Sequence, residues 1–133
     1  MLMEEIQQAF LAARDARLRA HAPYSHFQVG GAVLVAGDAR VFVGCNVENA
    51  SYGACICAER SAIMHMVSVR GVGVIEHVVV VTAVSPPSVP CALCLQVIAE
   101  FATPKTQIHL ADLEGIKRTV TFGELLPEPF VLV

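Results

Sequence analysis

Two short stretches, Cys57-Ala58-Glu59-Arg60 and Pro90-Cys91-Ala92-Leu93-Cys94, contain the residues around which the rest of the chain is arranged. Three thiols from two separate segments can hold one zinc ion, and three protein ligands leave the fourth tetrahedral position to water. An open fourth position is typical of a catalytic zinc site and not of a structural one. We therefore predict that the three cysteines bind the metal and that the glutamate is the catalytic carboxylate.

Each stretch is predicted to begin a helix. Pro90 suits the first turn, because its missing N–H costs nothing there, and Cys91 and Cys94 are three residues apart and so share one helix face. The positive end of the helix dipole stabilises an anionic sulfur at this position. Residues two apart on a regular helix point in different directions. Cys57 must therefore lie at the very start of its helix if Glu59 is to reach the same ion.

Other interpretations of the cysteines and of Glu59 are open. A C-x-x-C pair is also typical of a redox pair or of half a structural zinc site. A redox pair is disfavoured because a third cysteine comes with an acid nearby, and a structural site needs a fourth ligand, which Cys45 or Cys55 would have to supply. Cys55 could also compete with Cys57, but only Cys57 has a glutamate two residues on, so we expect Cys45 and Cys55 to be small buried hydrophobes. Glu59 could instead be an ordinary first-turn glutamate near the dipole.

The flanking sequence predicts an α/β layered domain. Apolar residues at helical spacing fall on one face of the first segment, namely Ile6, Ala9, Phe10, Ala13 and Leu18. In chain order we expect a helix over 2–20, strands over 28–35 and 40–46 with a turn at 37–38, a helix over 57–69, a strand over 78–83, a loop over 85–90, a helix over 91–101, a strand over 107–111, a short helix over 121–126 and a last strand over 130–133. This order predicts a central mixed five-stranded sheet flanked by helices, in a single domain over residues 1–133.

Composition and charge exclude several classes of protein. The net charge is −3 and aromatic residues make up 6% of the chain, so the basic stripe and stacking platform of a nucleic-acid binder are missing. Arg14, Arg17 and Arg19 fall near the end of the first predicted helix, where basic residues suit the dipole. No apolar run approaches the roughly 20 residues that span a membrane, and the N-terminus does not have the pattern of a signal peptide. We expect a cytoplasmic protein whose five cysteines are reduced.

The sequence resembles the homotetrameric cytidine deaminases, a family of zinc-dependent nucleoside deaminases. Beyond the two metal stretches, the resemblance rests on Ala22–Ser25, Phe27–Gly30, Gly44–Ala50, Leu125–Pro127 and Phe130. It covers nearly the whole chain. The metal stretches alone specify only the wider class of zinc deaminases, whereas Asn46-Val47-Glu48-Asn49-Ala50 narrows the resemblance to the nucleoside branch.

The resemblance implies an α/β/α fold, one Zn²⁺ per subunit and a role for each matching residue. It implies that Cys57, Cys91 and Cys94 are zinc ligands, that Glu59 shuttles protons, that Asn46 and Glu48 bind the ribose hydroxyls, that Phe27 packs on the pyrimidine, that Ala58 contributes backbone contacts to the base and that Arg60 stands beside the thiolates. From spacing alone, Asn46 and Glu48 are explained equally well as turn caps. Tyr52 and Phe130 resemble positions where the family builds pockets across subunits, and ordinary core packing is the alternative.

Two residues depart from the family's usual pattern. Ala92 stands where a glycine is usual, and Leu95 stands where an arginine is usual, so that only Arg60 remains of two expected cations. Three thiolates and Zn²⁺ sum to −1. We therefore expect the water on the metal to ionise less readily than in relatives, which weakens turnover below neutral pH.

The activity that the resemblance implies is hydrolytic deamination of cytidine and 2′-deoxycytidine to uridine and 2′-deoxyuridine, with release of ammonia. Zinc-bound hydroxide would attack C4 of the base while Glu59 moves the protons, and the reaction would serve pyrimidine salvage. Alternatives are a blasticidin-S-type deaminase, an editing deaminase acting on a polynucleotide, which the acidic charge disfavours, and a non-catalytic scaffold stabilised by zinc.

Overall fold

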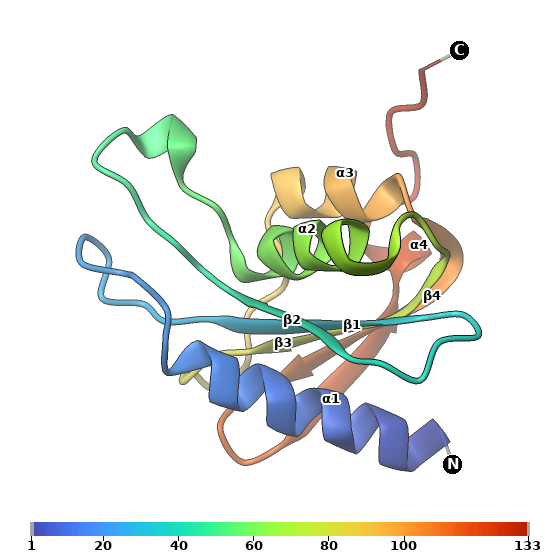
Figure 1. Cartoon of the computed structure of the whole chain (residues 1–133), viewed down its shortest axis with the longest axis horizontal. Helices are drawn as coiled ribbons and strands as arrows, with labels where there is room; N and C mark the ends of the chain where they lie inside the picture. Colours follow the sequence, from blue (N-terminus) through green and yellow to red (C-terminus); the bar gives the residue numbers. More distant parts are fainter. Residues whose placement is uncertain (1, 133) are drawn as a thin grey trace.

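The β-branched run of residues 78–81 lies in β3 (Ile75–Val81), the central strand of a sheet with the order β2-β1-β3-β4-β5. The computed structural model describes residues 2–132. Strand β3 runs antiparallel to β1 and parallel to β4, so the sheet is mixed. The predicted five-stranded mixed sheet is confirmed, and helices cover both of its faces (Figure 1).

The other elements follow the predicted order, except that η1 and β5 were not predicted, and their bounds differ from the predicted ones. They are α1 (Leu2–Arg17), β1 (Gly30–Val35), β2 (Phe42–Cys45), the 3₁₀ turn η1 (Tyr52–Ala54), α2 (Ala58–Arg70), α3 (Ala92–Ala99), β4 (Ala102–Ala111), β5 (Ile116–Thr121) and α4 (Phe122–Leu125). Gly37 lies in the connection between β1 and β2 with φ of 73°, and Gly71 ends α2 with φ of 91°. Both glycines adopt the left-handed region that other residues rarely enter. None of the helices within residues 2–132 has the length and apolarity needed to cross a membrane.

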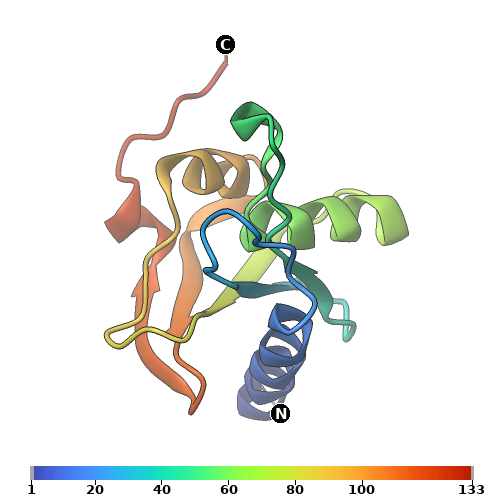
Figure 2. The same ribbon diagram turned by 90° about the vertical axis from the view of Figure 1, so that its left-hand side faces the viewer.

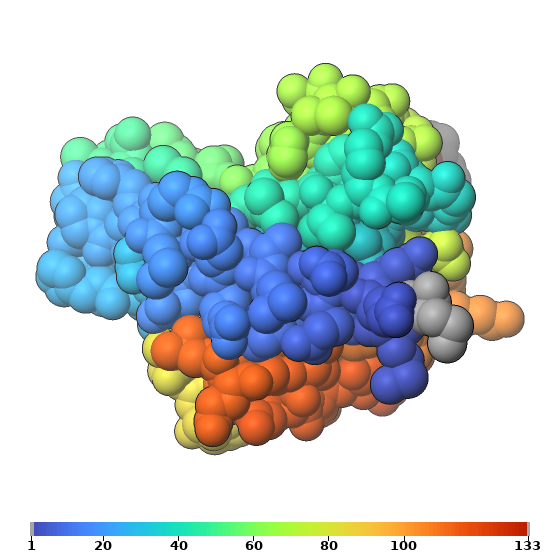
Figure 3. Space-filling view, turned by 60° about the horizontal axis from the view of Figure 1, so that its bottom comes forward, coloured from blue at the N-terminus to red at the C-terminus, as the bar shows by residue number. Residues whose placement is uncertain are grey.

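Alternate residues of the inner strands face two separate cores. Val78 and Val80 of β3 lie in the larger core, beneath α2 and α3, whereas Val79 and Val81 face α1. This is the two-sided burial expected of a central strand next to a parallel neighbour. Figure 2 shows α1 on one side of the sheet and α2 and α3 on the other. Figure 3 shows the α1 face, where α1 lies between the β1–β2 hairpin and the β4–β5 segment.

Glycines let both helical layers approach the sheet closely. A Cβ on Gly30 would lie 1.9 Å from the carbonyl oxygen of Ala13 in α1, and one on Gly44 would lie 2.3 Å from the backbone nitrogen of Ala62 in α2. Real Cβ atoms do not come this close to backbone atoms. The two glycines therefore fix how near α1 and α2 lie to the strands.

Three predictions about the elements are wrong. The first helix ends at Arg17, and Leu18 is exposed and not part of its apolar face. The fifth strand is β5 and not residues 130–133: residues 130–132 have no regular structure, and residue 133 lies outside the described range. Strand β5 carries Lys117 and Arg118 on an exposed edge, where charged side chains discourage pairing with other chains. Strand β5 was not predicted from the sequence because its apolar pattern is weak.

Candidate active site

The N-termini of α2 and α3 bring the three predicted ligands together. Cys57 and Cys91 are the N-cap residues of the two helices, both with extended backbone, and neither side chain caps its helix. Cys94 lies one turn into α3 and is buried. The Sγ atoms of the three residues all lie within 4.8 Å of one another, the one such group of potential metal ligands found among residues 2–132.

The spacing of the sulfur atoms suits a tetrahedral zinc ion. The Sγ atoms of Cys91 and Cys94 are 3.6 Å apart. Two thiolates on one tetrahedral Zn²⁺ with bonds of about 2.3 Å would be about 3.8 Å apart. The described geometry is therefore compatible with one metal ion held by all three thiols.

Charges and hydrogen bonds at the thiols favour the anionic form of Cys57. A hydrogen bond with Cys94 is the main cause that lowers the pKa of Cys57, to about 5, and the guanidinium of Arg60 adds to the effect. Arg60 Nη2 lies 3.6 Å from Cys57 Sγ and donates to the carbonyl of Cys55 at 3.3 Å. The same sulfur–sulfur contact and burial raise the pKa of Cys94. A divalent cation would remove this competition for a proton, because metal ligands must be deprotonated.

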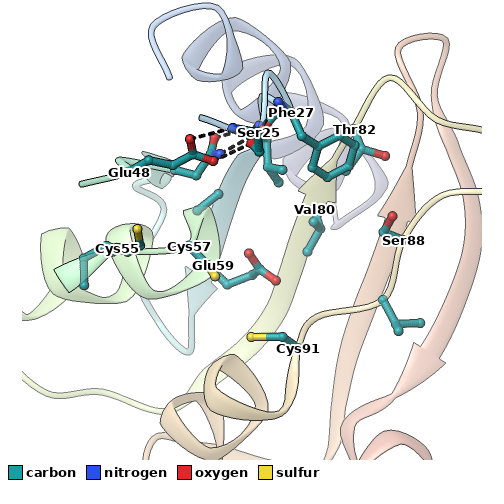
Figure 4. A pocket seen from close by; sticks show the side chains of 15 residues that line it. Ser25, Phe27, Glu48, Cys55, Cys57, Glu59, Val80, Thr82, Ser88 and Cys91 are labelled. Atoms are coloured by element: carbon teal, nitrogen blue, oxygen red, sulfur yellow. Dashed lines mark hydrogen bonds between the residues drawn. The ribbon is translucent and has the colours of Figure 1, made fainter. Parts of the chain in front are cut away.

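Glu59 is a buried carboxyl group next to the thiols. It lies in the first turn of α2, only 5% of its surface is exposed, and it points into the space between Cys57 and Cys91 (Figure 4). Loss of solvent raises the pKa of Glu59 to about 7, and the nearby Cys57 thiolate adds to the rise. An ordinary first-turn glutamate would be exposed with an unshifted pKa. A carboxyl group with a pKa near 7 suits both accepting and donating protons.

A cavity of about 360 Å³ opens above Glu59 and the thiols. Its lining includes the predicted site residues Phe27, Asn46, Glu48, Cys57, Ala58, Glu59 and Cys91. Cys94 and Arg60 lie next to this cavity without lining it. The volume is in the range of small-molecule sites.

Asn46 and Glu48 both hold the loop that forms the cavity rim. Asn46 Oδ1 accepts a hydrogen bond from the backbone N–H of Val29 at 2.8 Å, and its Nδ2 donates to the carbonyl of Phe27 at 2.8 Å. Glu48 accepts from the backbone N–H groups of Tyr24 and Ser25 at 3.0 and 3.1 Å. Both side chains therefore make the backbone hydrogen bonds that the turn-cap interpretation expects. Both side chains also border the cavity, so the two roles are compatible.

The other residues discussed from the sequence are Cys45, Cys55, Tyr52, Phe130 and Leu95, and they differ in how far they are buried. Cys45 and Cys55 are only partly buried, so the expectation of buried hydrophobes is wrong, and neither belongs to the thiol cluster. Tyr52 is 76% exposed and Phe130 is 70% exposed, which excludes the core-packing alternative within this chain. Leu95 is buried in the larger core.

The cavity is also lined by residues that were not predicted from the sequence. They are Ser25, Val29, Cys55, Ile56, Val80, Thr82, Ser88 and Val89. Val80 and Thr82 belong to β3 and the residue after it, which the sequence identified as a core strand. Their contribution to the site depends on where β3 ends beneath the two helix N-termini, and no local signal marks this.

The fold and the site together define a class, the metal-dependent deaminase-like α/β enzymes. The family model for the cytidine and deoxycytidylate deaminase zinc-binding region matches residues 3–110. A cytidine deaminase of Halalkalibacterium halodurans is 42% identical over 118 residues, covering 89% of this chain and 88% of that protein. A cytidine deaminase of Sporosarcina psychrophila is 38% identical over 126 residues, covering 95% and 91%.

Structural comparison gives the same result. The crystal structure of cytidine deaminase from Burkholderia pseudomallei matches with a TM-score of 0.84 and 41% sequence identity, covering 93% of this chain and 98% of that chain. The chain therefore belongs to the cytidine and deoxycytidylate deaminase family.

Proposed function

We propose that this protein catalyses the hydrolytic deamination of cytidine and 2′-deoxycytidine to the corresponding uridines, with release of ammonia, in pyrimidine salvage. The observation that carries the proposal is the buried Glu59 carboxyl group beside three clustered thiols at the base of a cavity. The similarity to cytidine deaminases over nearly the whole chain supports the same substrate class.

Each side chain at the cavity base has a distinct task in this reaction. Cys57, Cys91 and Cys94 would hold Zn²⁺, which when bound supplies a Lewis acid that lowers the pKa of water toward about 7. Glu59 would accept a proton from the attacking water and would deliver protons to the ring nitrogen and to the leaving amine. Burial raises the pKa of Glu59, which suits a carboxyl group that both accepts and donates protons. Arg60 offsets part of the thiolate charge.

The walls of the cavity supply the contacts that orient a nucleoside. Phe27 would pack against the pyrimidine, and the backbone of Ala58 at the start of α2 would bond the base. Asn46 and Glu48 would bind the sugar hydroxyls. Glu48 suits this role because its side chain is only partly buried and because hydrogen bonds from Ser25 and Tyr24 lower its pKa. The lowered pKa keeps the carboxylate ionised and able to accept hydrogen bonds.

The assembly that we propose is a homotetramer in the cytoplasm. Large exposed apolar side chains lie on η1, α2, α3 and the C-terminal tail, including Tyr52, Met64, Val67, Leu93 and Phe130. These elements lie on the same side of the sheet (Figures 1 and 2). Obligate interfaces are more apolar than ordinary surface. The five unpaired cysteines suit a reducing compartment.

A cytidine absorbance assay together with metal analysis tests the activity. We expect wild-type protein to contain one zinc per chain and to deaminate cytidine. Glu59→Ala should retain the metal and lose turnover by at least about a hundredfold, because proton transfer by a positioned side chain contributes about 10²–10⁴-fold. An inactive wild type with full zinc would support the scaffold alternative, whereas a fully active Glu59→Ala protein would contradict the proposed role of Glu59.

Parallel rates on cytidine and blasticidin S separate the two nucleoside deaminases. We expect a higher kcat/KM on cytidine. Binding of RNA or single-stranded DNA in a gel shift at moderate salt would instead favour an editing deaminase.

A further inference from the structure

Ser25 occupies a junction between two walls of the cavity. Its hydroxyl donates a hydrogen bond to Glu48 Oε2, and Ser25 Oγ itself accepts from the backbone N–H of Phe27 at 3.0 Å. One small side chain thus joins the carboxylate proposed to bind the sugar to the aromatic residue proposed to contact the base. Figure 4 shows Ser25 between these two residues at the rim of the cavity.

The contacts of Glu48 leave it oriented with one acceptor position free. Oε1 receives the backbone N–H groups of Tyr24 and Ser25, and Oε2 receives the Ser25 hydroxyl. A carboxylate has about four lone-pair sites, so Oε2 retains capacity for one further donor, such as a sugar hydroxyl. The hydrogen bond from the Ser25 side chain is also the main cause that lowers the pKa of Glu48.

The backbone of the loop holds Ser25 in this position. His26 adopts φ of 58°, in the left-handed region that residues other than glycine seldom enter. Its N–H donates to the carbonyl of Ala22 at 2.9 Å. The left-handed residue reverses the chain between Ser25 and Phe27, so that the Phe27 N–H returns to the Ser25 hydroxyl. Backbone of this kind persists where the surroundings determine it.

We propose that Ser25 is a positioning residue for the sugar half of the substrate, acting through Glu48 and, secondarily, through the Phe27 backbone. The inference rests on the proposed nucleoside deaminase function. It predicts that the Ser25 hydroxyl matters for substrates with 2′- and 3′-hydroxyls and matters little for those that lack both.

Kinetics of Ser25→Ala on two substrates test this role. With cytidine we expect kcat/KM to fall about tenfold, mainly through KM, because a hydrogen bond to a charged group is lost while two others remain. With 2′,3′-dideoxycytidine, which lacks the 2′- and 3′-hydroxyls that Glu48 would bind, we expect a change of less than about twofold. Ser25→Thr keeps the hydroxyl and should restore most of the cytidine activity. The matched control is Ser51→Ala, because Ser51 is exposed and its side chain does not cap η1.

A double-mutant cycle tests whether Ser25 acts on the substrate through Glu48. If Ser25 acts through Glu48, adding Ser25→Ala to Glu48→Gln should cost much less than Ser25→Ala costs alone. Equal losses on both substrates would show a purely structural role and overturn the assignment. Unchanged cytidine kinetics or fully additive mutations would overturn it as well.

Binding measurements separate this inference from the proposed activity. A wild type that deaminates neither nucleoside overturns the proposed function. Calorimetric titration with uridine and 2′,3′-dideoxyuridine then decides the role of Ser25, since a tenfold weaker Kd for uridine alone in Ser25→Ala supports it. Equal affinities in wild type and variant, or no binding of uridine to either, overturn it.

Discussion

At the scale of single residues, Arg60 and Leu95 set the charge around the three thiols. Arg60 lies against Cys57 Sγ, and the position after Cys94 carries an apolar side chain that belongs to the larger core. The structure thus explains what Leu95 does for stability. Because this position carries leucine and not arginine, one positive charge fewer lies beside the thiolates than in the usual pattern of the family.

Leu95→Arg tests whether that missing charge limits the reaction at low pH. We expect the acid limb of the kcat pH profile to move to lower pH, because a cation near the thiolates favours ionisation of the catalytic water. Stability should fall, because Leu95 is only 8% exposed. Leu95→Met, which conserves volume and charge, should leave the profile unchanged. An acid limb that stays in place in Leu95→Arg would show that another group sets it.

At the scale of elements, the position of α2 against the strands determines the site. Cys57 is the N-cap residue of this helix and Glu59 lies in its first turn, so any shift of α2 moves a proposed ligand and the carboxylate together. Gly44 of β2 makes the close approach of α2 possible. The His77–His109 pair, by contrast, lies on the opposite face of the sheet, between β3 and β4.

Gly44→Ala should move or strain α2. The added Cβ would lie 2.3 Å from the backbone nitrogen of Ala62, and overpacking of this kind costs about 1–3 kcal/mol. We expect a lower free energy of unfolding in denaturant titration and a reduced zinc content. Gly115→Ala, where a Cβ meets nothing within 4 Å, is the control. Equal stability of the two variants would contradict the close-approach argument.

The buried histidine pair should make the fold sensitive to acid. His77 Nδ1 and His109 Nε2 lie 3.0 Å apart, and His109 Nδ1 lies 2.9 Å from Thr119 Oγ1 of β5. Burial, and secondarily His77, lowers the pKa of His109 from 6.5 to about 4. Burial also lowers the pKa of His77, which Glu76 and Glu5 of α1 partly oppose.

The unfolded chain therefore takes up protons before the folded one as the pH falls through 6.5. The contribution of His109 to stability is complete above pH 6.5 and is lost progressively down to about pH 4. The shift corresponds to about 3 kcal/mol over that window. Denaturant titrations at several pH values should show a shallower acid decline for His109→Gln than for wild type. Parallel curves for the two proteins would contradict the prediction, since loss of metal in acid affects both equally.

At the scale of the whole molecule, the face of the sheet that α2 and α3 cover carries the site and is also rich in exposed apolar residues. Tyr52 in η1 and Phe130 in the tail project from it without a core to enter. Gln96 Nε2 of α3 holds the tail by donating to the Phe130 carbonyl at 3.0 Å. This surface is suited to burial against further copies of the chain.

Light scattering on a sizing column should give a mass of four chains for the wild type. Phe130→Ala and Tyr52→Ala each remove a large exposed apolar side chain, so we expect partial dissociation into smaller species on dilution. Leu18→Ala, an exposed leucine near the end of α1 on the other side of the sheet, should not change the mass. A wild type that elutes as a monomer would contradict the proposed assembly.

Features that depend on near neighbours along the chain could be predicted from the amino-acid sequence. The helix starts next to Cys57 and Cys91 follow from Pro90 and from dipole preferences within one turn, and the two-sided burial of β3 follows from its run of valines. The tertiary structure alone decided the rest. Strand β5 exists because it pairs with β4, Glu59 has its raised pKa because distant segments bury it, and the rim loop is held by Asn46 and Glu48 from about twenty residues away. Such contacts join residues whose local sequence carries no record of their partners, so only the folded chain reveals them.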